Sequence, residues 1–432
     1  MRGSELRLEL SEPVRLVLAR LRQAGHSAFL VGGAVRDAVL HRPIQDWDVA
    51  TSAPPDLVSS LFSRVIPTGL RHGTVTVRIQ AQNIEVSTFR GASILEDLSH
   101  RDFTLDAMAY DPQTGSLLDP NRGLEDCRMG LLRAVGDPVE RLREDPLRAL
   151  RAVRLASELH LEIHWELGIA LGKVSSEINR VAPERIRVEL ERLIMSEAPS
   201  RGLDTLTETG ILPLIIPELF CAAQEQDDAL CQVLFRTLDL LPARAVLRWA
   251  GLLHRLGGSL GEVRSCGSPQ IAARMAREVL LRLRMSKRKC DTVSHLILHQ
   301  NIPIRPTWSE GELRELLVGI GVGHVREVLC LRRASLMAAK ADPGSIRNME
   351  ELDRRLVSFL EAPGAQESLR PVLDGTDVME LLGLEPGPKV GEILAEIQKA
   401  VAADPGLNRR DVLSAWVSHR YCGVERAPQP AP

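Results

Sequence analysis

Two patterns of hydrophobic and polar residues divide the chain. Between Ser27 and Val135, short runs rich in β-branched residues are separated by turn residues, and alternation is clearest in residues 74–79 and 84–89. The segments SAFLVGG, WDVAT, GTVTVRI, NIEVSTF, AMAYD and LLRAVG therefore predict strands. Ala34–Leu40 and Pro55–Phe62 between them predict helices, the second with proline in its first turn. This part of the chain is predicted to be an α+β unit on a small mixed or antiparallel sheet.

After Asp137 the pattern becomes helical. Leu, Ala, Arg and Glu recur at helical spacing in RLREDPLRALRAVRLASELH, PERIRVELERLIM, RAVLRWAGLLHRLG and ARMAREVLLRLRM, and no fixed-period repeat is found. Gly and Pro clusters near residues 265–269, 301–306 and 361–365 interrupt the helices. We therefore predict an α+β part at 1–136 and three helical parts at 137–200, 201–362 and 363–432.

Composition narrows the class of protein. With 432 residues, 44% of them hydrophobic and 26% charged, the chain is predicted to fold into several globular domains. No apolar run approaches the roughly 20 residues that cross a membrane, and the first residues carry charges where a secretory signal needs an apolar core. Seven scattered cysteines without a CxxC motif argue against a disulfide framework or a zinc knuckle. We expect a cytoplasmic protein without a membrane partner. Since the net charge is only −3, any nucleic acid would be bound by local basic patches.

The strongest candidate site begins at a glycine pair. Gly32 and Gly33 end a predicted strand just before a predicted helix, and Arg36 lies one turn into that helix. Glycines allow a phosphate to approach the backbone, and a guanidinium binds the same anion. A Gly-Gly pair before a helix is by itself more often only a tight turn.

Carboxylates nearby strengthen this interpretation. Asp46 and Asp48 are two residues apart on a predicted strand, so both side chains point to one face. Adjacent ionised carboxylates repel unless a cation lies between them, and Mg²⁺ bound to a triphosphate favours one or two carboxylates plus phosphate oxygens. Glu85, on a later strand, can add a third carboxylate to that face. The alternative is a solvated DxD at a strand edge.

Ordered motifs along the chain resemble those of one enzyme family. VGGAVRD, DWDVATSA, RHGTVTV, EVSTFR, RDFTLDAMAYD, GLEDCRMGLLRAVGDP and REDPLRALRAVR occur in the order seen in class II tRNA nucleotidyltransferases, which share a polymerase-β-like head with bacterial poly(A) polymerases. The similarity is dense over the first half and returns at DGTDVMELLGLEPGPKVGEIL. The resemblance implies a catalytic head at 1–136, a neck with a nucleotide-selecting motif at 137–200, a body at 201–362 and a tRNA-binding tail at 363–432.

The resemblance also implies a reaction and its residues. The enzyme would add nucleotides to the 3′ end of the tRNA acceptor arm without a nucleic-acid template, using two Mg²⁺ ions and releasing pyrophosphate. The matching positions are Asp46 and Asp48 for the metals with Glu85 as a further catalytic carboxylate, Gly32, Gly33 and Arg36 for the triphosphate, and Arg101 and Asp102 for the ribose. The chain departs from the family pattern at His100, usually Arg, and at Asp106, usually Asn, which puts sugar discrimination in doubt.

Base selection is predicted from Glu144, Asp145 and Arg148. The i, i+3 spacing places Asp145 and Arg148 on one face of a helix, where a carboxylate accepts and a guanidinium donates hydrogen bonds. Cytosine and adenine offer an amino donor beside an acceptor, whereas uracil and guanine would leave buried groups unpaired at roughly 1–3 kcal/mol each. CTP and ATP are therefore expected substrates. In the family this motif selects the base, and Arg151 and Arg154 match further nucleotide contacts. The alternative is an ordinary surface salt bridge.

A short connection suggests the product. Family members that build the whole CCA end carry a polar loop between the TFR strand and the RRD motif, but here only GASILEDLSH lies between Arg90 and Arg101. The resemblance implies that enzymes in which this loop is missing or shortened add two cytidines and leave the terminal A to a separate enzyme. We therefore predict CC addition. The alternatives are a full CCA-adding enzyme, an A-adding enzyme, a poly(A) polymerase and a non-catalytic RNA-binding protein with the same fold.

The helical half resembles a degenerate HD phosphohydrolase domain. In the block RWAGLLHRLG, Arg255 replaces the metal-binding aspartate that would follow His254, so no hydrolase activity is expected. His295 and His299 are four residues apart on a predicted helix and are interpreted as structural rather than metal-binding. RNA contacts are expected from basic clusters, or these are solvated helix faces: Arg282, Arg284, Lys287, Arg288 and Lys289, with a smaller pair at Arg332 and Arg333.

Overall fold

The computed structural model describes residues 8–70, 73–220, 224–257, 268–362 and 369–422. The chain forms two compact units, residues 1–217 and 218–432. Arg71 and His72 of the RHGTVTV motif, and parts of the predicted body and tail, lie outside the described residues. Among the described helices, none is long and apolar enough to cross a membrane.

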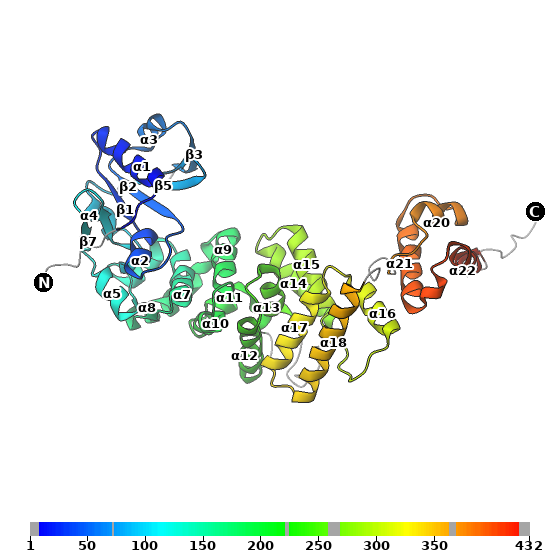
Figure 1. Cartoon of the computed structure of the whole chain (residues 1–432). Coiled ribbons are helices and arrows are strands. Elements are labelled where there is room, and N and C mark those ends of the chain that lie inside the picture. Colours follow the sequence, from blue (N-terminus) through cyan, green and yellow to red (C-terminus); the bar gives the residue numbers. More distant parts are fainter. Residues whose placement is uncertain (1–7, 71–72, 221–223, 258–267, 363–368, 423–432) are drawn as a thin grey trace, which may run out of the picture. The chain divides into compact units, whose positions relative to one another are not determined.

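The first unit is built on a mixed sheet of seven strands (Figure 1). The strand order is β3-β4-β5-β2-β1-β6-β7, in which β2 and β5 are parallel and all other neighbours are antiparallel. This confirms the predicted α+β class. The strands are β1 (Ala28–Val31), β2 (Trp47–Thr51), β3 (Val65–Gly69), β4 (Thr74–Ile79), β5 (Gln82–Thr88), β6 (Ala109–Asp111) and β7 (Ser116–Leu118).

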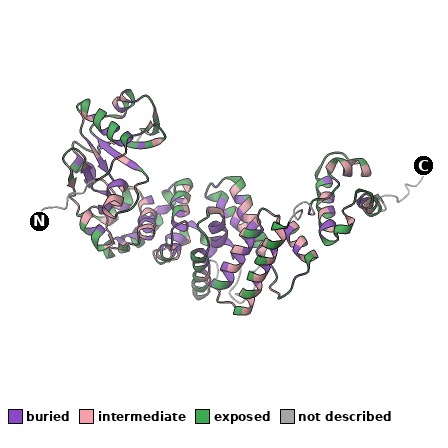
Figure 2. Cartoon of the chain, viewed as in Figure 1, coloured by how far each residue is buried: buried purple, intermediate pink, exposed green. Residues whose placement is uncertain are grey.

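Helices cover this sheet and continue into the neck. Helix α4 packs Ile94 and Leu98 against Val31, Ala50 and Ala109 of the sheet, so the element after the short connection belongs to the head core. Figure 2 shows buried residues concentrated in the strands and on the inner sides of the helices. The helices of this unit are α1 (Glu12–Gln23), α2 (Gly33–Val39), α3 (Pro55–Leu61), α4 (Ile94–Ser99), η2 (Thr104–Asp106), α5 (Gly123–Met129), α6 (Pro138–Glu144), α7 (Leu147–Leu159), α8 (Trp165–Val174), η3 (Ser175–Arg180), α9 (Pro183–Ile194), α10 (Pro199–Glu208) and α11 (Ile211–Ile215).

One prediction about the boundary between the two patterns is wrong. A short strand, β9 (Glu162–Ile163), follows Asp137 and pairs in parallel with β8 (Leu131–Leu132). Its hydrogen bonds are the Glu162 N–H to the Gly130 carbonyl at 2.8 Å and the His164 N–H to the Leu132 carbonyl at 2.9 Å. This pair connects the end of the head to the neck, and two residues are too few to give an alternating pattern.

The described residues of the second unit form helices and connecting segments and contain no strand. Its C-terminal core consists of eight buried aliphatic residues: Leu373, Val378, Val390, Ile393, Ile397, Val401, Leu413 and Val417. The division of this half into body and tail stays a prediction. The helices are η4 (Pro217–Leu219), which spans the unit boundary, α12 (Gln224–Leu240), α13 (Ala245–Leu253), α14 (Pro269–Arg282), α15 (Lys287–Leu298), α16 (Glu310–Ile320), α17 (Val325–Ala338), α18 (Pro343–Glu361), α20 (Gly375–Leu382), α21 (Pro388–Ala403), η6 (Pro405–Leu407) and α22 (Arg410–Cys422).

His254, in the block that resembles an HD domain, is fully buried at the end of α13. Its Nδ1 lies 2.8 Å from the Gly251 carbonyl, and its Nε2 lies 2.9 Å from the Ser335 hydroxyl. Burial, reinforced by Arg255, lowers the pKa of His254 to about 3. The imidazole is therefore neutral and hydrogen-bonded inside the helical core. His295 lies on α15 and His299 immediately follows it, with ring centroids 4.5 Å apart. The described residues contain no group of three or more potential metal ligands.

Candidate active site

The glycine turn between β1 and α2 forms one wall of the site. Gly32 is buried and has φ +67° and ψ −138°, a conformation that side chains strongly disfavour. A Cβ atom at Gly32 would lie 3.1 Å from Arg101 Nη1 and 3.2 Å from Asp48 Oδ2. Glycine is therefore required both by the backbone and by the close approach of two predicted site residues.

The predicted carboxylates lie beside this turn. Asp48 on β2 is paired in register with Val31 on β1 and with Glu85 on β5, while Asp46 immediately precedes β2. Burial, together with the charges of Glu85, Asp106 and Asp46, raises the pKa of Asp48 to about 7 despite the opposing effect of Arg101. In its charged form this carboxylate would be stabilised by a nearby cation.

These residues fit the predicted Mg²⁺. Mg²⁺ is usually held by one or two carboxylates together with water and substrate phosphates, so a group of three protein ligands, which the described residues lack, is not required. Asp46 and Asp48 would hold the metal. When bound, Mg²⁺ would favour ionisation of the attacking hydroxyl and neutralise the leaving phosphate groups.

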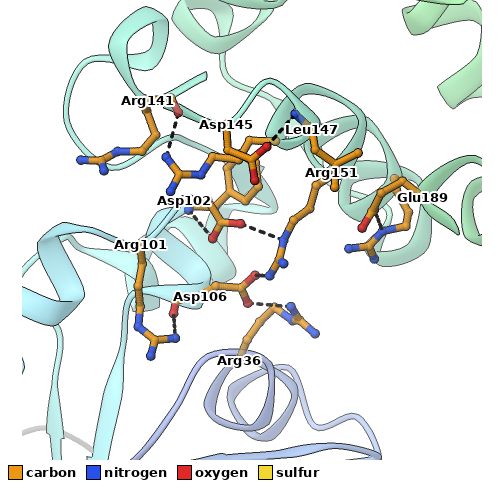
Figure 3. A network of polar contacts seen from close by, with 12 residues as sticks. Arg36, Arg101, Asp102, Asp106, Arg141, Asp145, Leu147, Arg151 and Glu189 are labelled. Carbon is orange, nitrogen blue, oxygen red and sulfur yellow. Dashed lines mark hydrogen bonds and ion pairs between the residues drawn. The ribbon is translucent and has the colours of Figure 1, made fainter. Parts of the chain in front are cut away.

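A chain of alternating charges connects the head to the neck (Figure 3). Arg36 Nη1 donates to Asp106 Oδ1 at 2.6 Å, and Arg36 Nε donates to Asp37 Oδ1 at 2.9 Å. Arg151 of α7 contacts Asp102 Oδ2 through Nε at 2.7 Å and Asp106 Oδ2 through Nη2 at 3.5 Å. The structure thus brings together five residues that the sequence placed in three separate motifs, with Asp106 at their centre.

Arg101 is oriented by a buried carboxylate that the sequence did not single out. Its Nε and Nη2 lie 3.2 and 3.1 Å from Asp97 Oδ2, and its Nη1 donates to the Asp106 carbonyl at 3.4 Å. Asp97 is only 3% exposed and also accepts the Arg90 N–H at 3.0 Å. Asp97 therefore joins the RRD motif to the connection that follows β5.

The predicted base-selecting residues do not share a helix face. Asp145 ends α6 in an extended conformation, φ −145° and ψ 100°, and α7 begins only at Leu147. Pro146 explains the break, because the residue before a proline is disfavoured in the helical region. The predicted i, i+3 helical arrangement of Asp145 and Arg148 is therefore wrong.

Each residue of this motif has another partner. The Asp145 carboxylate is paired with Arg185 of α9, with Oδ2 2.8 Å from Nη2, and Arg148 Nη1 donates to Glu144 Oε2 at 2.7 Å. Hydrogen bonds from Arg148 and Arg141 lower the pKa of Glu144 against the opposing effect of burial. The three residues remain neighbours at the α6–α7 junction, where the Arg148 N–H donates to the Asp145 carbonyl at 2.9 Å.

Arg141 connects this junction to α4. Its Nη2 donates to the Ser99 carbonyl at 3.0 Å, its Nη1 lies 2.9 Å from Glu144 Oε2, and its own carbonyl accepts Arg148 Nη1 at 2.8 Å. Neither the motifs nor the spacing indicated this residue, since its partners are up to 42 positions away.

A pocket of about 600 Å³ lies between the glycine turn and the neck helices. Its wall contains Gly33, Arg36, Asp46, Asp48 and Arg151. Arg154 also lines it but is only 2% exposed, because its guanidinium is paired with Glu189 Oε2 at 2.5 Å and with Glu158. No motif or spacing indicated three further residues of the wall, His160, Arg192 and Ser196.

The basic cluster of the second unit is only partly available to RNA. Arg282, Arg284, Lys287 and Arg288 are exposed at the α14–α15 junction, and Arg282 is also paired with Glu218, Nη1 to Oε1 at 2.5 Å. Arg332 of the smaller pair is buried, at 8% exposure.

Comparisons with known proteins agree with this architecture. Residues 28–133 match the family model of the poly A polymerase head domain, and residues 160–222 match the model described as the probable RNA and SrmB-binding site of polymerase A. The CCA-adding enzymes of Geobacillus sp. strain WCH70 and Geobacillus stearothermophilus are 31% and 32% identical over 422 residues, in each case 94% of this chain and 96% of the relative.

Solved structures of CCA-adding enzymes are also similar to this chain. The crystal structure of the Bacillus stearothermophilus CCA-adding enzyme in complex with CTP is 30% identical, has a TM-score of 0.72, and is matched over 97% of this chain and 100% of that one. The Thermotoga maritima CCA-adding enzyme complexed with tRNA, 18% identical with a TM-score of 0.62, shares the fold. The chain therefore belongs to the class II tRNA nucleotidyltransferase family, the family of the CCA-adding enzymes, and is a nucleotidyltransferase.

Proposed function

We propose that this enzyme transfers CMP from CTP to the 3′ end of tRNA, in the cytoplasm where tRNA matures. The terminal 3′ oxygen forms a bond to the α-phosphorus of CTP and loses its proton, while the bond from that phosphorus to the bridging β-phosphate oxygen breaks and pyrophosphate leaves. The observation that carries the proposal is the meeting of Asp46, Asp48 and Arg36 in one pocket, in a chain similar over most of its length to CCA-adding enzymes.

Each residue has a role in this proposal. Asp46 and Asp48 hold Mg²⁺, and Glu85 adds negative charge beside Asp48. Gly32, Gly33 and Arg36 contact the triphosphate, and Arg101 and Asp102 contact the ribose. Glu144, Asp145 and Arg148 select the base, with Arg151 and Arg154 as further nucleotide contacts.

We further propose that addition stops after two cytidines, because the connection after β5 is a capped turn. Glu96 Oε2 accepts the Ala92 N–H at 2.8 Å, and the Ser93 hydroxyl accepts the Glu96 N–H at 3.3 Å, as in a helix cap. Gly91, at φ +148°, has no room for a side chain, since a Cβ would lie 2.5 Å from Glu96 Oε2. A turn held in this way has little freedom to re-aim the base-selecting residues from cytosine to adenine.

The contacts of Arg141 support the same specificity. Because Arg141 bridges the carboxyl end of α4 to both Glu144 and Arg148, the capped turn and the base-selecting residues share one network. A separate A-adding enzyme would then complete the tRNA.

Full CCA addition is the second candidate, and the relatives favour it. The two Geobacillus relatives and the structure in complex with CTP are named CCA-adding enzymes rather than CC-adding enzymes. In this candidate, another element of the chain supports the switch from cytosine to adenine.

The two candidates are separated by a product assay. Purified protein with Mg²⁺ receives tRNA transcripts that lack the 3′ end, that end in C, or that end in CC. Each transcript is given CTP, ATP, UTP or GTP singly, then CTP with ATP, and the products are resolved to one nucleotide. Two cytidines followed by a stop with ATP present support CC addition, whereas a terminal A on the CC product establishes the second candidate.

Other outcomes identify the remaining alternatives. AMP added only to the CC-ended transcript would make this an A-adding enzyme, and long A tracts would make it a poly(A) polymerase. tRNA binding without incorporation of any nucleotide would leave a non-catalytic RNA-binding protein with this fold.

A further inference from the structure

Asp106 is a buried negative charge beside the pocket. It ends η2, is 2% exposed, and its Oδ1 accepts a hydrogen bond from Arg36 Nη1 at 2.6 Å. Arg36, followed by Arg151 and Arg101, lowers the pKa of Asp106 and overcomes the effect of burial, so the carboxylate stays ionised. The position is also a departure of this chain from the family pattern, in which an uncharged Asn is usual.

The positive charge of Arg36 is consequently more than balanced by neighbouring carboxylates. Its guanidinium donates to Asp106 at one end and contacts Asp37 through both Nε and Nη2 at 2.9 Å. Arg36 lines the pocket, yet it brings two carboxylates with it, so the three side chains together carry a charge of −1. An entering phosphate group gains less electrostatic attraction from such a group than from a lone arginine.

Arg151 is in the same situation on the neck side. Its guanidinium is paired with Asp102 at 2.7 Å and with Asp106 at 3.5 Å. The second oxygen of Asp106 accepts no hydrogen bond from the described residues, so this contact is an ion pair at long range. One carboxylate thus offsets part of the charge of both arginines that are proposed to contact the nucleotide.

We propose that Asp106 is a positioning residue that orients Arg36 while weakening the binding of the pyrophosphate group at this site. The inference rests on the proposed function, because it takes Arg36 and Arg151 as nucleotide contacts. Its consequence is a site that binds CTP less tightly but releases pyrophosphate readily after each transfer, so that Asp106 acts on product release as well as on affinity.

The substitution Asp106→Asn separates this role from a structural one. An amide oxygen still accepts the hydrogen bond of Arg36 Nη1, Asp37 still holds the other side of the guanidinium, and the buried charge is gone. If Asp106 only stabilises the fold, Asn loosens the arginines and weakens anion binding. If it offsets their charge, Asn strengthens anion binding. The two roles therefore predict opposite signs.

The test is a calorimetric titration in which inorganic pyrophosphate is added to the enzyme in the presence of Mg²⁺ and in the absence of tRNA. We expect Asp106→Asn to bind pyrophosphate about tenfold more tightly than the original enzyme, as one unit charge within a buried site allows. In the CMP incorporation assay, the KM for CTP should fall, pyrophosphate should inhibit at lower concentration, and kcat should fall because release slows.

Asp126→Asn is the matched control. Asp126 is also 2% exposed and paired with an arginine, Arg133, at 3.3 Å, but it does not line the pocket. This variant should leave pyrophosphate affinity unchanged. Unchanged or weaker pyrophosphate binding in Asp106→Asn, in an enzyme that incorporates CMP, would overturn the inference. An original enzyme that incorporates no nucleotide would instead overturn the proposed function, whatever its affinity for pyrophosphate.

Discussion

Replacing Gly32 by Ala should impair catalysis through a single methyl group. The backbone at Gly32 lies at φ +67° and ψ −138°, where a residue with a Cβ atom costs about 1–3 kcal/mol. The methyl carbon would stand 3.1 Å from Arg101 Nη1 and 3.2 Å from Asp48 Oδ2, so both side chains must shift by a few tenths of an ångström. Because misplacement of reacting groups by about 1 Å can cost about 10²-fold in rate, we expect CMP incorporation to fall by roughly 10- to 100-fold.

The control for this variant is Gly25→Ala. Gly25 also has a positive φ, +85°, but no atom lies within 4 Å of a Cβ built there. Both variants should unfold a few degrees lower, since about 1 kcal/mol corresponds to roughly 2–4 °C in a domain of this size. Thermal unfolding and steady-state incorporation of CMP measure the two effects separately. Equal losses of activity in the two variants, or full activity of Gly32→Ala, would refute the reasoning.

Three further substitutions test other parts of the structure. Asp48→Asn should lower CMP incorporation about 10³-fold or more, because stabilisation of the transition state by the metal contributes several kcal/mol. The binding of tRNA in a filter assay should stay intact. Surviving activity would contradict the metal assignment. Arg141→Met should reduce the preference for CTP over ATP in kcat/KM by roughly tenfold, on the scale of one hydrogen bond to a charged group. The exposed neighbour Arg143→Met is the control and is expected to change nothing. The pKa of His254 is about 3 in the folded chain against 6.5 as the ordinary value, so its neutral form stabilises the fold fully above pH 6.5 and this stability is lost as the pH falls toward 3. Between pH 7.5 and 5 the loss should be about 2 kcal/mol, and urea unfolding of His254→Gln should lack this component; equal pH dependence in both proteins would argue against it.

The sequence predicted the central strands well, because they depend on local patterns. Alternation identified β4 and β5. The spacing of Asp46 and Asp48 predicted two carboxylates on one strand, but only Asp48 lies on β2 and Asp46 immediately precedes it; their catalytic role stays a prediction. Strand β3 was not predicted because it contains Pro67, a residue with low strand propensity. The structure places β3 at the edge of the sheet, where proline is tolerated.

The remaining parts of the site depend on contacts between distant positions. The pairing of Asp145 with Arg185, 40 residues away, and of Arg141 with Ser99 has no signature in the sequence. The end of the helix at Asp145 did have a signature in the sequence, because Pro146 disfavours a helical conformation at the residue before it. The departure at Asp106 was visible in the sequence, but the role proposed for it rests on three arginines from three segments that act on its charge.

The capped turn at residues 91–93 has a thermodynamic consequence for nucleotide binding. A flexible loop that orders over a substrate loses conformational entropy of about 1–2 kcal/mol per residue. The turn here is ordered by Glu96, Ser93 and Asp97 of its own chain, so no such entropy is lost there when CTP binds. Binding of CTP should accordingly show a small heat-capacity change, and its affinity should vary little with temperature compared with an enzyme that must fold a loop around each nucleotide.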